Sequence, residues 1–324
     1  MKGESAVRSE GATPQVVVLM STYQGERYVR QQLESILAQL PQAGRIIVRD
    51  DGSHDRTADE VAAVEDHRVT LHRGSNLGFG PSFLTLLMLV PPHTDMVMFS
   101  DQDDVWLPGK IERAWLHLRN LRDRAALYAS AQMLADADLR PLHPTPPWPR
   151  PPTLANALME NIVTGCTAAI NRPAIDLLQQ AGVPAGVHFH DWWMYLVLSA
   201  FGTVVYDDKP TLLYRQHSGN VIGHGAGWIG RQLRMASFLL RHDWIGILLG
   251  QVQALLRCYE ESLPTSTRDV VLAQFGIENR GVTPRWRVIF SIRRSRQKVV
   301  HELPLRLLLT LHKLGVRRQS GRTL

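Results

Sequence analysis

The chain has 324 residues, of which 36 are Lys or Arg, 30 are Asp or Glu and 44% are hydrophobic. This composition excludes bulk disorder and fibrous repeats, and the length allows one large or two ordinary domains. Two cysteines exclude a disulfide scaffold and a four-cysteine zinc site. Residues 1–14 are polar and lack the apolar stretch of a secretory signal, so we expect a disordered leader. Since no run of about 18 apolar residues predicts a membrane span, we expect a cytoplasmic protein.

The net charge of +6 is unevenly distributed along the chain. Residues 225–324 hold 17 Lys and Arg against 6 Asp and Glu, whereas residues 1–224 carry a small acidic excess. Such an asymmetry indicates two parts with different partners, and a basic part suits either nucleic acid or an anionic membrane. We therefore expect a boundary after residue 223 and a basic helical region over 224–324.

The first hundred residues alternate between apolar runs typical of strands and amphipathic patterns typical of helices. Predicted strands cover 16–20, 46–48, 69–72 and 96–99, and predicted helices cover 28–40, 55–64 and 83–90. This alternation predicts a parallel sheet with helices on both faces. In such a sheet ligands bind beyond the carboxyl ends of the strands.

The alternation becomes less regular after residue 104. We expect helices at 111–121, 173–180 and 192–200, and strands at 126–134, 162–170, 204–206 and 212–214. Six prolines between residues 143 and 152 predict a surface loop. Cys166 lies in the apolar stretch 162–170, where we expect a buried and inert thiol.

The sharpest functional signal is the acidic cluster Asp101-Gln102-Asp103-Asp104, which follows the predicted strand 96–99. Three carboxylates in four residues repel one another unless a cation neutralises them. Mg²⁺ prefers oxygen ligands and shares its coordination shell with phosphate, so a metal diphosphate is the interpretation we favour. The alternative is a solvated acidic turn before the next helix.

Two loops at the same sheet edge give weaker signals. Asp50 and Asp51 could accept the N–H of a pyrimidine base on which Tyr23 stacks, although taken alone the segment reads as an ordinary Asp-Gly turn. The loop 76–80 contains two glycines and could bring backbone N–H groups to a ligand. A plain helix entry explains that loop equally well.

Two later segments carry further candidates. Asp191 precedes an apolar helix, where it is either a helix N-cap or a general base that faces an acceptor hydroxyl. The segment 214–220 ends a short predicted strand with Arg215 and His217, which could neutralise a leaving diphosphate or bind its metal. Taken singly, each of these residues is more often part of a surface turn.

Four segments taken together resemble glycosyltransferase family 2. They are residues 17–26 (VVLMSTYQGE), 49–53 (RDDGS), 99–111 (FSDQDDVWLPGKI) and 190–193 (HDWW). The resemblance covers residues 15–223 and is closest to the bacterial rhamnosyltransferase-like branch. It implies a GT-A fold, which is an α/β, Rossmann-like nucleotide-binding fold with a mixed central sheet, here followed by a basic helical extension.

The resemblance also implies roles for individual residues. The donor nucleotide would contact Thr22, Tyr23, Gln24, Asp50, Asp51, Asn76, Asp101 and Gln102. A divalent metal, Mg²⁺ or Mn²⁺, would contact Asp101, Asp103 and His217, while Asp104 and Arg215 would face the donor sugar or diphosphate. Asp191 would be the catalytic base, with His190, Trp192 and Trp193 on the acceptor side. Two positions depart from the usual pattern, since many relatives have Asn instead of Gln24 and Glu instead of His190.

The implied activity is an inverting, metal-dependent transfer of a sugar from a nucleotide donor to a glycan hydroxyl. The resemblance favours dTDP-L-rhamnose as donor, with UDP-sugars as the alternative, and a cell-surface polysaccharide or lipid-linked glycan as acceptor. A basic, Trp-containing helical region could dock on the inner face of an anionic membrane, or it could be a solvated face of an ordinary subdomain. The competing functions are a non-catalytic nucleotide-sugar-binding protein and a basic nucleic-acid-binding protein. We expect no nucleic-acid partner because the sequence contains no motif of that class.

Overall fold

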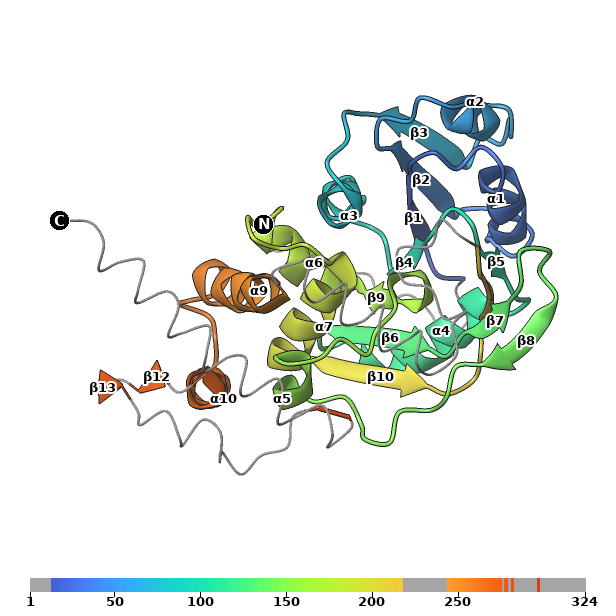
Figure 1. Ribbon diagram of the computed structural model, residues 1–324. Helices are drawn as coiled ribbons and strands as arrows, with labels where there is room; N and C mark the ends of the chain where they lie inside the picture. The colour runs from blue at the N-terminus through green and yellow to red at the C-terminus, as the bar shows by residue number, and fades with distance from the viewer. Residues whose placement is uncertain (1–12, 218–243, 276, 279–280, 283–295, 298–324) are drawn as a thin grey trace, which may run out of the picture.

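The computed structural model describes residues 13–217, 244–275, 277–278, 281–282 and 296–297. Its centre is a seven-stranded mixed sheet in the order β10-β6-β9-β4-β1-β2-β3 (Figure 1). The strands are β1 (Val16–Thr22), β2 (Arg45–Asp50), β3 (Val69–Arg73), β4 (Met96–Ser100), β6 (Ala126–Ser130), β9 (Ala169–Asn171) and β10 (Thr203–Asp207). β9 runs antiparallel to both of its neighbours, and the other adjacent pairs are parallel. The expected mixed central sheet is therefore confirmed.

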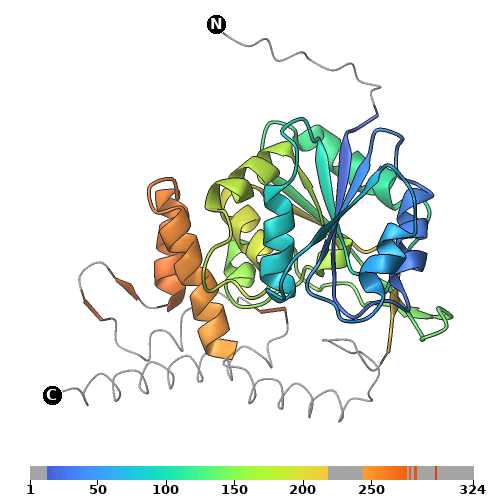
Figure 2. The same cartoon turned by 90° about the horizontal axis from the view of Figure 1, so that it is seen from above.

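Helices cover both faces of this sheet (Figure 2). One apolar cluster joins the sheet to α3 (Phe79–Met88), α6 (Arg172–Ala181) and α7 (His190–Phe201). The other joins it to α1 (Val29–Leu37), α2 (Thr57–Ala62) and α4 (Lys110–Leu118), which is extended by a 3₁₀ turn at Arg119–Leu121. The central strands β1 and β4 are buried on both faces, which explains why their sequences are continuous apolar runs.

A second, four-stranded sheet lies beside the carboxyl edge of the first and has the order β5-β11-β7-β8. Its strands are β5 (Val105–Trp106), β7 (Met133–Ala135), β8 (Pro141–Pro144) and β11 (Leu212–Arg215). The antiparallel pairing of β5 with β11 places the acidic cluster beside the segment that follows β11. The short helix α5 (Leu154–Ala157) and a 3₁₀ turn at Gly165–Thr167 follow along the chain.

The described part of the C-terminal third is packed onto the α/β core. α9 (Trp244–Cys258) and α10 (Thr265–Phe275) lie outside the layer that contains α7 (Figure 2), and β12 (Ile277–Glu278) pairs with β13 (Gly281–Val282). The buried residues of α9 belong to the same apolar cluster as those of α7. A cut after residue 223 would therefore remove a helix from the core. Within the described ranges, no helix is long and apolar enough to cross a membrane.

Some expected elements differ in the structure. The strand expected over 162–170 is reduced to β9, because the Gly165 N–H is bound by a side chain from α7 and the backbone turns there. The strand expected over 126–134 is divided into β6 and β7, which belong to different sheets. α3 begins four residues earlier than expected because Pro81 lies in its first turn, where the missing N–H costs no helical hydrogen bond. The expected proline loop starts as the edge strand β8, a position that tolerates proline.

Candidate active site

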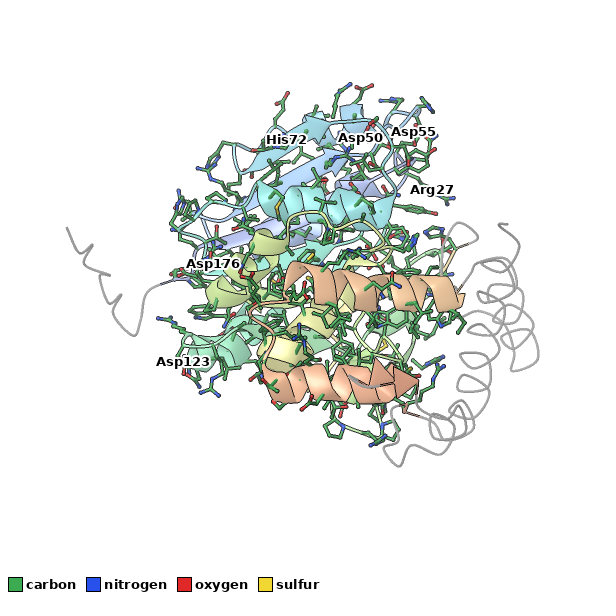
Figure 3. The ribbon with its side chains drawn as sticks, turned by 90° about the vertical axis from the view of Figure 1, so that its left-hand side faces the viewer. Arg27, Asp50, Asp55, His72, Asp123 and Asp176 are labelled. Carbon is green, nitrogen blue, oxygen red and sulfur yellow. The ribbon has the colours of Figure 1, made fainter. Side chains whose placement is uncertain are left out.

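The polar segments singled out in the sequence meet at one edge of the large sheet. Thr22, Asp50 and Ser100 are the last residues of β1, β2 and β4, and these strands are parallel neighbours. Figure 3 shows Arg27, Asp50 and Asp55 toward one end of the molecule, while Asp123 and Asp176 lie toward the opposite end. The loops that follow β1, β2 and β4 therefore surround a single candidate site.

Asp50 is bonded within its own corner of the site. It is 4% exposed, and its Oδ1 accepts from Thr22 Oγ1 at 3.1 Å and from Ser53 Oγ at 2.6 Å. Its Oδ2 accepts from the Ser53 backbone N–H at 3.0 Å. Asp50 therefore fixes the turn after β2 and joins it to the end of β1, which agrees with a supporting role.

Asp51 is buried and holds the glycine-containing loop. It is 2% exposed and forms an ion pair with Arg49. Its two carboxylate oxygens accept from the N–H groups of Leu77 and Gly78, each at 2.9 Å. Gly78 has φ +81°, a conformation that L side chains rarely adopt. These two loop N–H groups are engaged by Asp51, and the Asn76 side chain accepts from Gly78 N at 3.1 Å.

Tyr23 presents an open aromatic face at the site, because its side chain is 46% exposed. Gln102 holds the backbone of this residue from both sides: Tyr23 N donates to Gln102 Oε1 and Gln102 Nε2 donates to Tyr23 O, each at 2.9 Å. The Gln102 carboxamide packs over Gly25, where a Cβ would overlap it. Gln102 thus connects the loop after β4 to the loop after β1. Gln24, in the second of these loops, has φ +51° and donates its N–H to Ser53 Oγ.

The three carboxylates of the acidic cluster have different surroundings. Asp104 is 1% exposed; its Oδ1 accepts from Arg215 N at 3.2 Å, and its Oδ2 has no hydrogen-bond partner within the described residues. Ligand atoms of Asp101, Asp104 and Cys166 lie within 4.8 Å of one another. Burial, followed by the charges of neighbouring carboxylates, raises the pKa of Asp101 and of Asp104. This crowding of negative charge fits a cation-binding site.

Lys110 is a buried cation that the sequence reading did not assign. It is 1% exposed, and its Nζ donates to Cys166 O at 3.0 Å and to Thr211 Oγ1 at 3.1 Å. Burial lowers the pKa of Lys110 to about 8, while Cys166, Asp104 and Asp101 act in the opposite direction. A lone lysine after a proline turn reads as a surface residue, so only its place inside the 99–111 motif could have indicated this position.

His217 and Arg215 contact the acidic cluster from the segment around the end of β11. His217 Nε2 and Asp103 Oδ2 are 2.9 Å apart. Arg215 is 4% exposed and donates from Nε to Asp103 O at 2.8 Å and from Nη1 to Ala137 O at 2.7 Å. The structure thus joins His217 with the acidic cluster as expected, while the Arg215 guanidinium is bound to protein groups.

Asp191 lies in the first turn of α7, partly buried, with both carboxylate oxygens oriented by backbone N–H groups. Oδ1 accepts from Trp192 N at 2.6 Å, and Oδ2 accepts from Gly165 N at 3.2 Å. Burial raises the pKa of Asp191 to about 6. The negative charge of Asp191 is also among the causes that raise the pKa of Asp101, so the two carboxylates lie near each other.

The residues expected on the acceptor side are core residues in the structure. Trp192 and Trp193 are 2% and 0% exposed, and Trp192 Nε1 donates to Ala157 O at 2.7 Å. His190 is 3% exposed and stacks on Phe83 with ring centroids 4.0 Å apart. Burial lowers the pKa of His190 to about 3. Their burial leaves these three side chains no free surface, so we do not retain them as acceptor contacts.

Most of the basic and aromatic residues expected to face a membrane lie outside the described residues. Among those that are described, Trp244 stacks on Trp192 with ring centroids 5.0 Å apart, and Arg296 forms an ion pair with Glu160 at 3.3 Å. Both of these side chains therefore contact the protein itself.

Comparisons with known proteins agree with this arrangement. Residues 17–176, which contain the ends of β1, β2 and β4, match the family described as Glycosyl transferase family 2. Residues 17–176 therefore belong to glycosyltransferase family 2. This glycosyltransferase is 27% identical over 247 residues to the dTDP-rhamnosyl transferase RfbG of Shigella flexneri, a match that covers 69% of this chain and 80% of the relative. It is 36% identical over 104 residues to the succinoglycan biosynthesis protein ExoW of Rhizobium meliloti, covering 31% and 33% of the two chains.

Solved structures show the same fold. The glycosyltransferase resembles residues 1–349 of S. aureus TarS in complex with UDP-GlcNAc, with a TM-score of 0.55 and 15% identity over 95% of this chain and 92% of that one. It also resembles the mannosyltransferase PcManGT from Pyrobaculum calidifontis in complex with GDP-Man and Mn²⁺, with a TM-score of 0.50 and 15% identity over 94% and 88% of the two chains. The glycosyltransferase therefore has the GT-A fold.

Proposed function

We propose that this glycosyltransferase moves a sugar from a nucleotide donor to a glycan hydroxyl with inversion at the anomeric carbon. The observation that carries the proposal is the position of Asp191. It is the carboxylate at the start of α7, it lies near the acidic cluster, and its raised pKa suits a general base. A diphosphate and its cation would bind at the acidic cluster.

The backbone contacts of Asp191 support this role. The N–H groups of Gly165 and Trp192 fix the plane of the carboxylate, and a carboxylate with about four acceptor positions can still accept a proton beside these bonds. The acceptor oxygen would lose its proton to Asp191 as it attacks the anomeric carbon from the face opposite the diphosphate. The bond between that carbon and the diphosphate oxygen then breaks, and the nucleoside diphosphate leaves.

The donor set fits a divalent cation. The Asp104 Oδ2 atom is buried without a hydrogen-bond partner in the described part of the chain, and the neighbouring carboxylates raise one another's pKa. Asp101 and Asp103 would hold Mg²⁺ or Mn²⁺, since carboxylates suit these ions, and His217 would stand beside them as the third member of the set. When bound, the cation supplies positive charge that stabilises the departing diphosphate.

We propose dTDP-L-rhamnose as the donor and a cell-surface polysaccharide or lipid-linked glycan as the acceptor. The rhamnosyl donor is supported by the similarity to RfbG of Shigella flexneri, whose name specifies a dTDP-rhamnosyl donor. Within the site, the exposed ring of Tyr23 offers a stacking surface for a pyrimidine base. UDP-sugars remain the second donor class, because uracil differs from thymine by one methyl group.

A panel of nucleotide sugars tests the function. The purified full-length protein is incubated with Mn²⁺ and dTDP-L-rhamnose, UDP-glucose, UDP-GlcNAc or GDP-mannose, and release of the nucleoside diphosphate is measured with and without a glycan acceptor extract. We expect acceptor-stimulated release from the dTDP donor and no release by an Asp191→Asn variant. Binding of a nucleotide sugar without any turnover would support a non-catalytic binding protein instead.

We also propose peripheral docking on the inner face of the cytoplasmic membrane through the basic region 224–324. The support is the excess of 17 Lys and Arg over 6 Asp and Glu in residues 225–324. Because α9 belongs to the core, the test uses the full chain and a version that ends at residue 297. If neither protein floats more with anionic vesicles than with neutral ones, and the two proteins float to the same extent, the docking proposal is wrong.

A further inference from the structure

Tyr28 occupies an unusual position at the start of α1. Its ring is partly buried and belongs to neither of the two apolar clusters of the described residues. Three polar or charged groups surround it: the His217 ring is stacked on it with centroids 5.0 Å apart and planes 26° apart, and the guanidinium carbons of Arg215 and Arg27 lie 4.7 Å and 5.3 Å from its centroid. The tyrosine ring thus contacts cationic partners and not the hydrophobic core.

Two of these partners hold the backbone and side chain of the acidic cluster. His217 Nε2 lies 2.9 Å from Asp103 Oδ2, and Arg215 Nε donates to Asp103 O at 2.8 Å. Arg215 has a second contact with α1 besides Tyr28, because Arg215 Nη2 donates to Gln31 Oε1 at 2.6 Å. Tyr28 and Gln31 are three residues apart and so lie on the same side of the first helical turn. The first turn of α1 therefore supports the metal side of the site from behind.

The ring is suited to a histidine that binds a cation. The face of an aromatic ring carries negative electrostatic potential, which attracts cations and polarised rings. An imidazole that donates its electron pair to a metal becomes more positive, so its stacking on Tyr28 is strengthened when the metal binds. Ligands that are held in the correct plane by a neighbouring group bind metals more tightly than freely rotating ones.

We propose that Tyr28 is a positioning residue for the metal side of the site: its ring sets the plane of His217, and His217 in turn sets the carboxylate of Asp103. This inference rests on the proposed metal-assisted transfer. In this inference the aromatic ring of Tyr28, and not its hydroxyl group, increases the affinity for the divalent ion.

The test is a titration of the full-length protein with Mn²⁺, in which free Mn²⁺ is measured by electron paramagnetic resonance. We expect Tyr28→Leu to raise the Kd for Mn²⁺ about tenfold, the range measured when groups that orient metal ligands are removed. Tyr28→Phe, which keeps the ring, should restore a Kd within about twofold of wild type by the same reasoning. Wild-type affinity in Tyr28→Leu, or equal weakening in both variants, would overturn the inference.

A double-mutant cycle shows whether Tyr28 acts through His217. In a His217→Gln background, Tyr28→Leu should leave the Mn²⁺ affinity unchanged, because the group that it positions is absent. A further tenfold loss in that background would contradict the mechanism. In transfer assays, Tyr28→Leu should raise the Mn²⁺ concentration needed for half-maximal rate while kcat recovers at saturating Mn²⁺. A kcat that stays low at every Mn²⁺ concentration, with a lowered melting temperature, would show a structural role and overturn the inference.

The outcomes for wild type separate this inference from the proposed function. A wild-type protein that binds Mn²⁺ in a Tyr28-dependent manner but transfers no sugar would contradict the proposed transfer and support the positioning role. A wild-type protein that transfers sugar and binds no Mn²⁺ would overturn the positioning role and leave the transfer standing.

Discussion

The carboxylates at the ends of β2 and β4 lie on the same sheet edge but differ in how many hydrogen-bond donors surround them. Asp50 and Asp51, at the end of β2, accept hydrogen bonds from N–H, O–H or guanidinium groups at both oxygens. Asp101 and Asp104, after β4, lie among other carboxylates, and the buried Asp104 keeps an oxygen without a hydrogen-bond partner in the described residues. The first pair is satisfied by hydrogen bonds within the protein, whereas in the second set the carboxylates raise one another's pKa, and the buried Lys110 opposes this rise for Asp101. The comparison separates an acidic motif that holds loops together from one that we propose for ligand binding.

Asp191→Asn should have the largest effect on activity. The amide cannot accept the acceptor's proton, so we expect transfer to fall by about 10³-fold, within the range for loss of a general base. Donor affinity should change little, because Asn has the shape of Asp and its amide oxygen can still accept a hydrogen bond from the N–H of Gly165 or of Trp192. Transfer kinetics and calorimetric binding of dTDP measure the two effects. Asp176→Asn, an exposed change at the opposite end of the molecule (Figure 3), is the matched control.

Asp51→Ala should mainly reduce stability. It leaves the buried Arg49 guanidinium and the N–H groups of Leu77 and Gly78 without their partner, and breaking a buried pair costs about 3 kcal/mol of unfolding free energy. Urea unfolding followed by circular dichroism measures this loss. Asp59→Ala breaks the exposed pair with Arg73 and should cost less than about 0.5 kcal/mol. An equal loss of unfolding free energy in the two variants would show that Asp51 stabilises the fold no more than an exposed carboxylate does.

Asp103→Ala should act on the ligand instead. We expect the fold to remain stable and the metal-dependent part of donor affinity to fall about 100-fold, because the variant removes an expected metal ligand and the partner of His217. The measurement is nucleotide-sugar binding with Mn²⁺ and with a chelator. If wild type binds the donor with the same affinity under both conditions, the assignment of a cation to the acidic cluster is wrong.

The pH dependence of transfer gives the smallest effect. Burial raises the pKa of Asp191 to about 6. A general base acts in its deprotonated form, so kcat/KM should be full above this value and should fall as the pH drops through it, about tenfold per unit. Rates measured between pH 5 and pH 8 with donor binding as control test this expectation. A kcat/KM that stays constant down to pH 5 would show that the pKa of Asp191 is not raised to about 6.

The sequence predicted the parallel β1 to β4 part well because each strand is a short apolar run that ends in a polar motif. It also predicted that the segments around Asp50, Asp101, Asp191 and His217 meet. The sequence pattern could not show that Trp192 and Trp193 face the core, because α7 is apolar on nearly all of its faces and the pattern does not tell which face is turned toward the site. The roles of Lys110 and Tyr28 depend on contacts between residues far apart in the sequence, Lys110 with Cys166 and Tyr28 with His217. No local pattern encodes such contacts.

The stacking of Trp244 on Trp192 has a practical consequence for engineering. Trp192 directly follows Asp191, so the start of α9 and the start of α7 share one aromatic contact. Chimeras that exchange the C-terminal region between related enzymes, to redirect them to another acceptor, would mismatch this pair. A successful exchange would have to include α7 together with α9. The point at which the two parental sequences are connected would then lie before α7, within the part of the chain that contains the candidate active site.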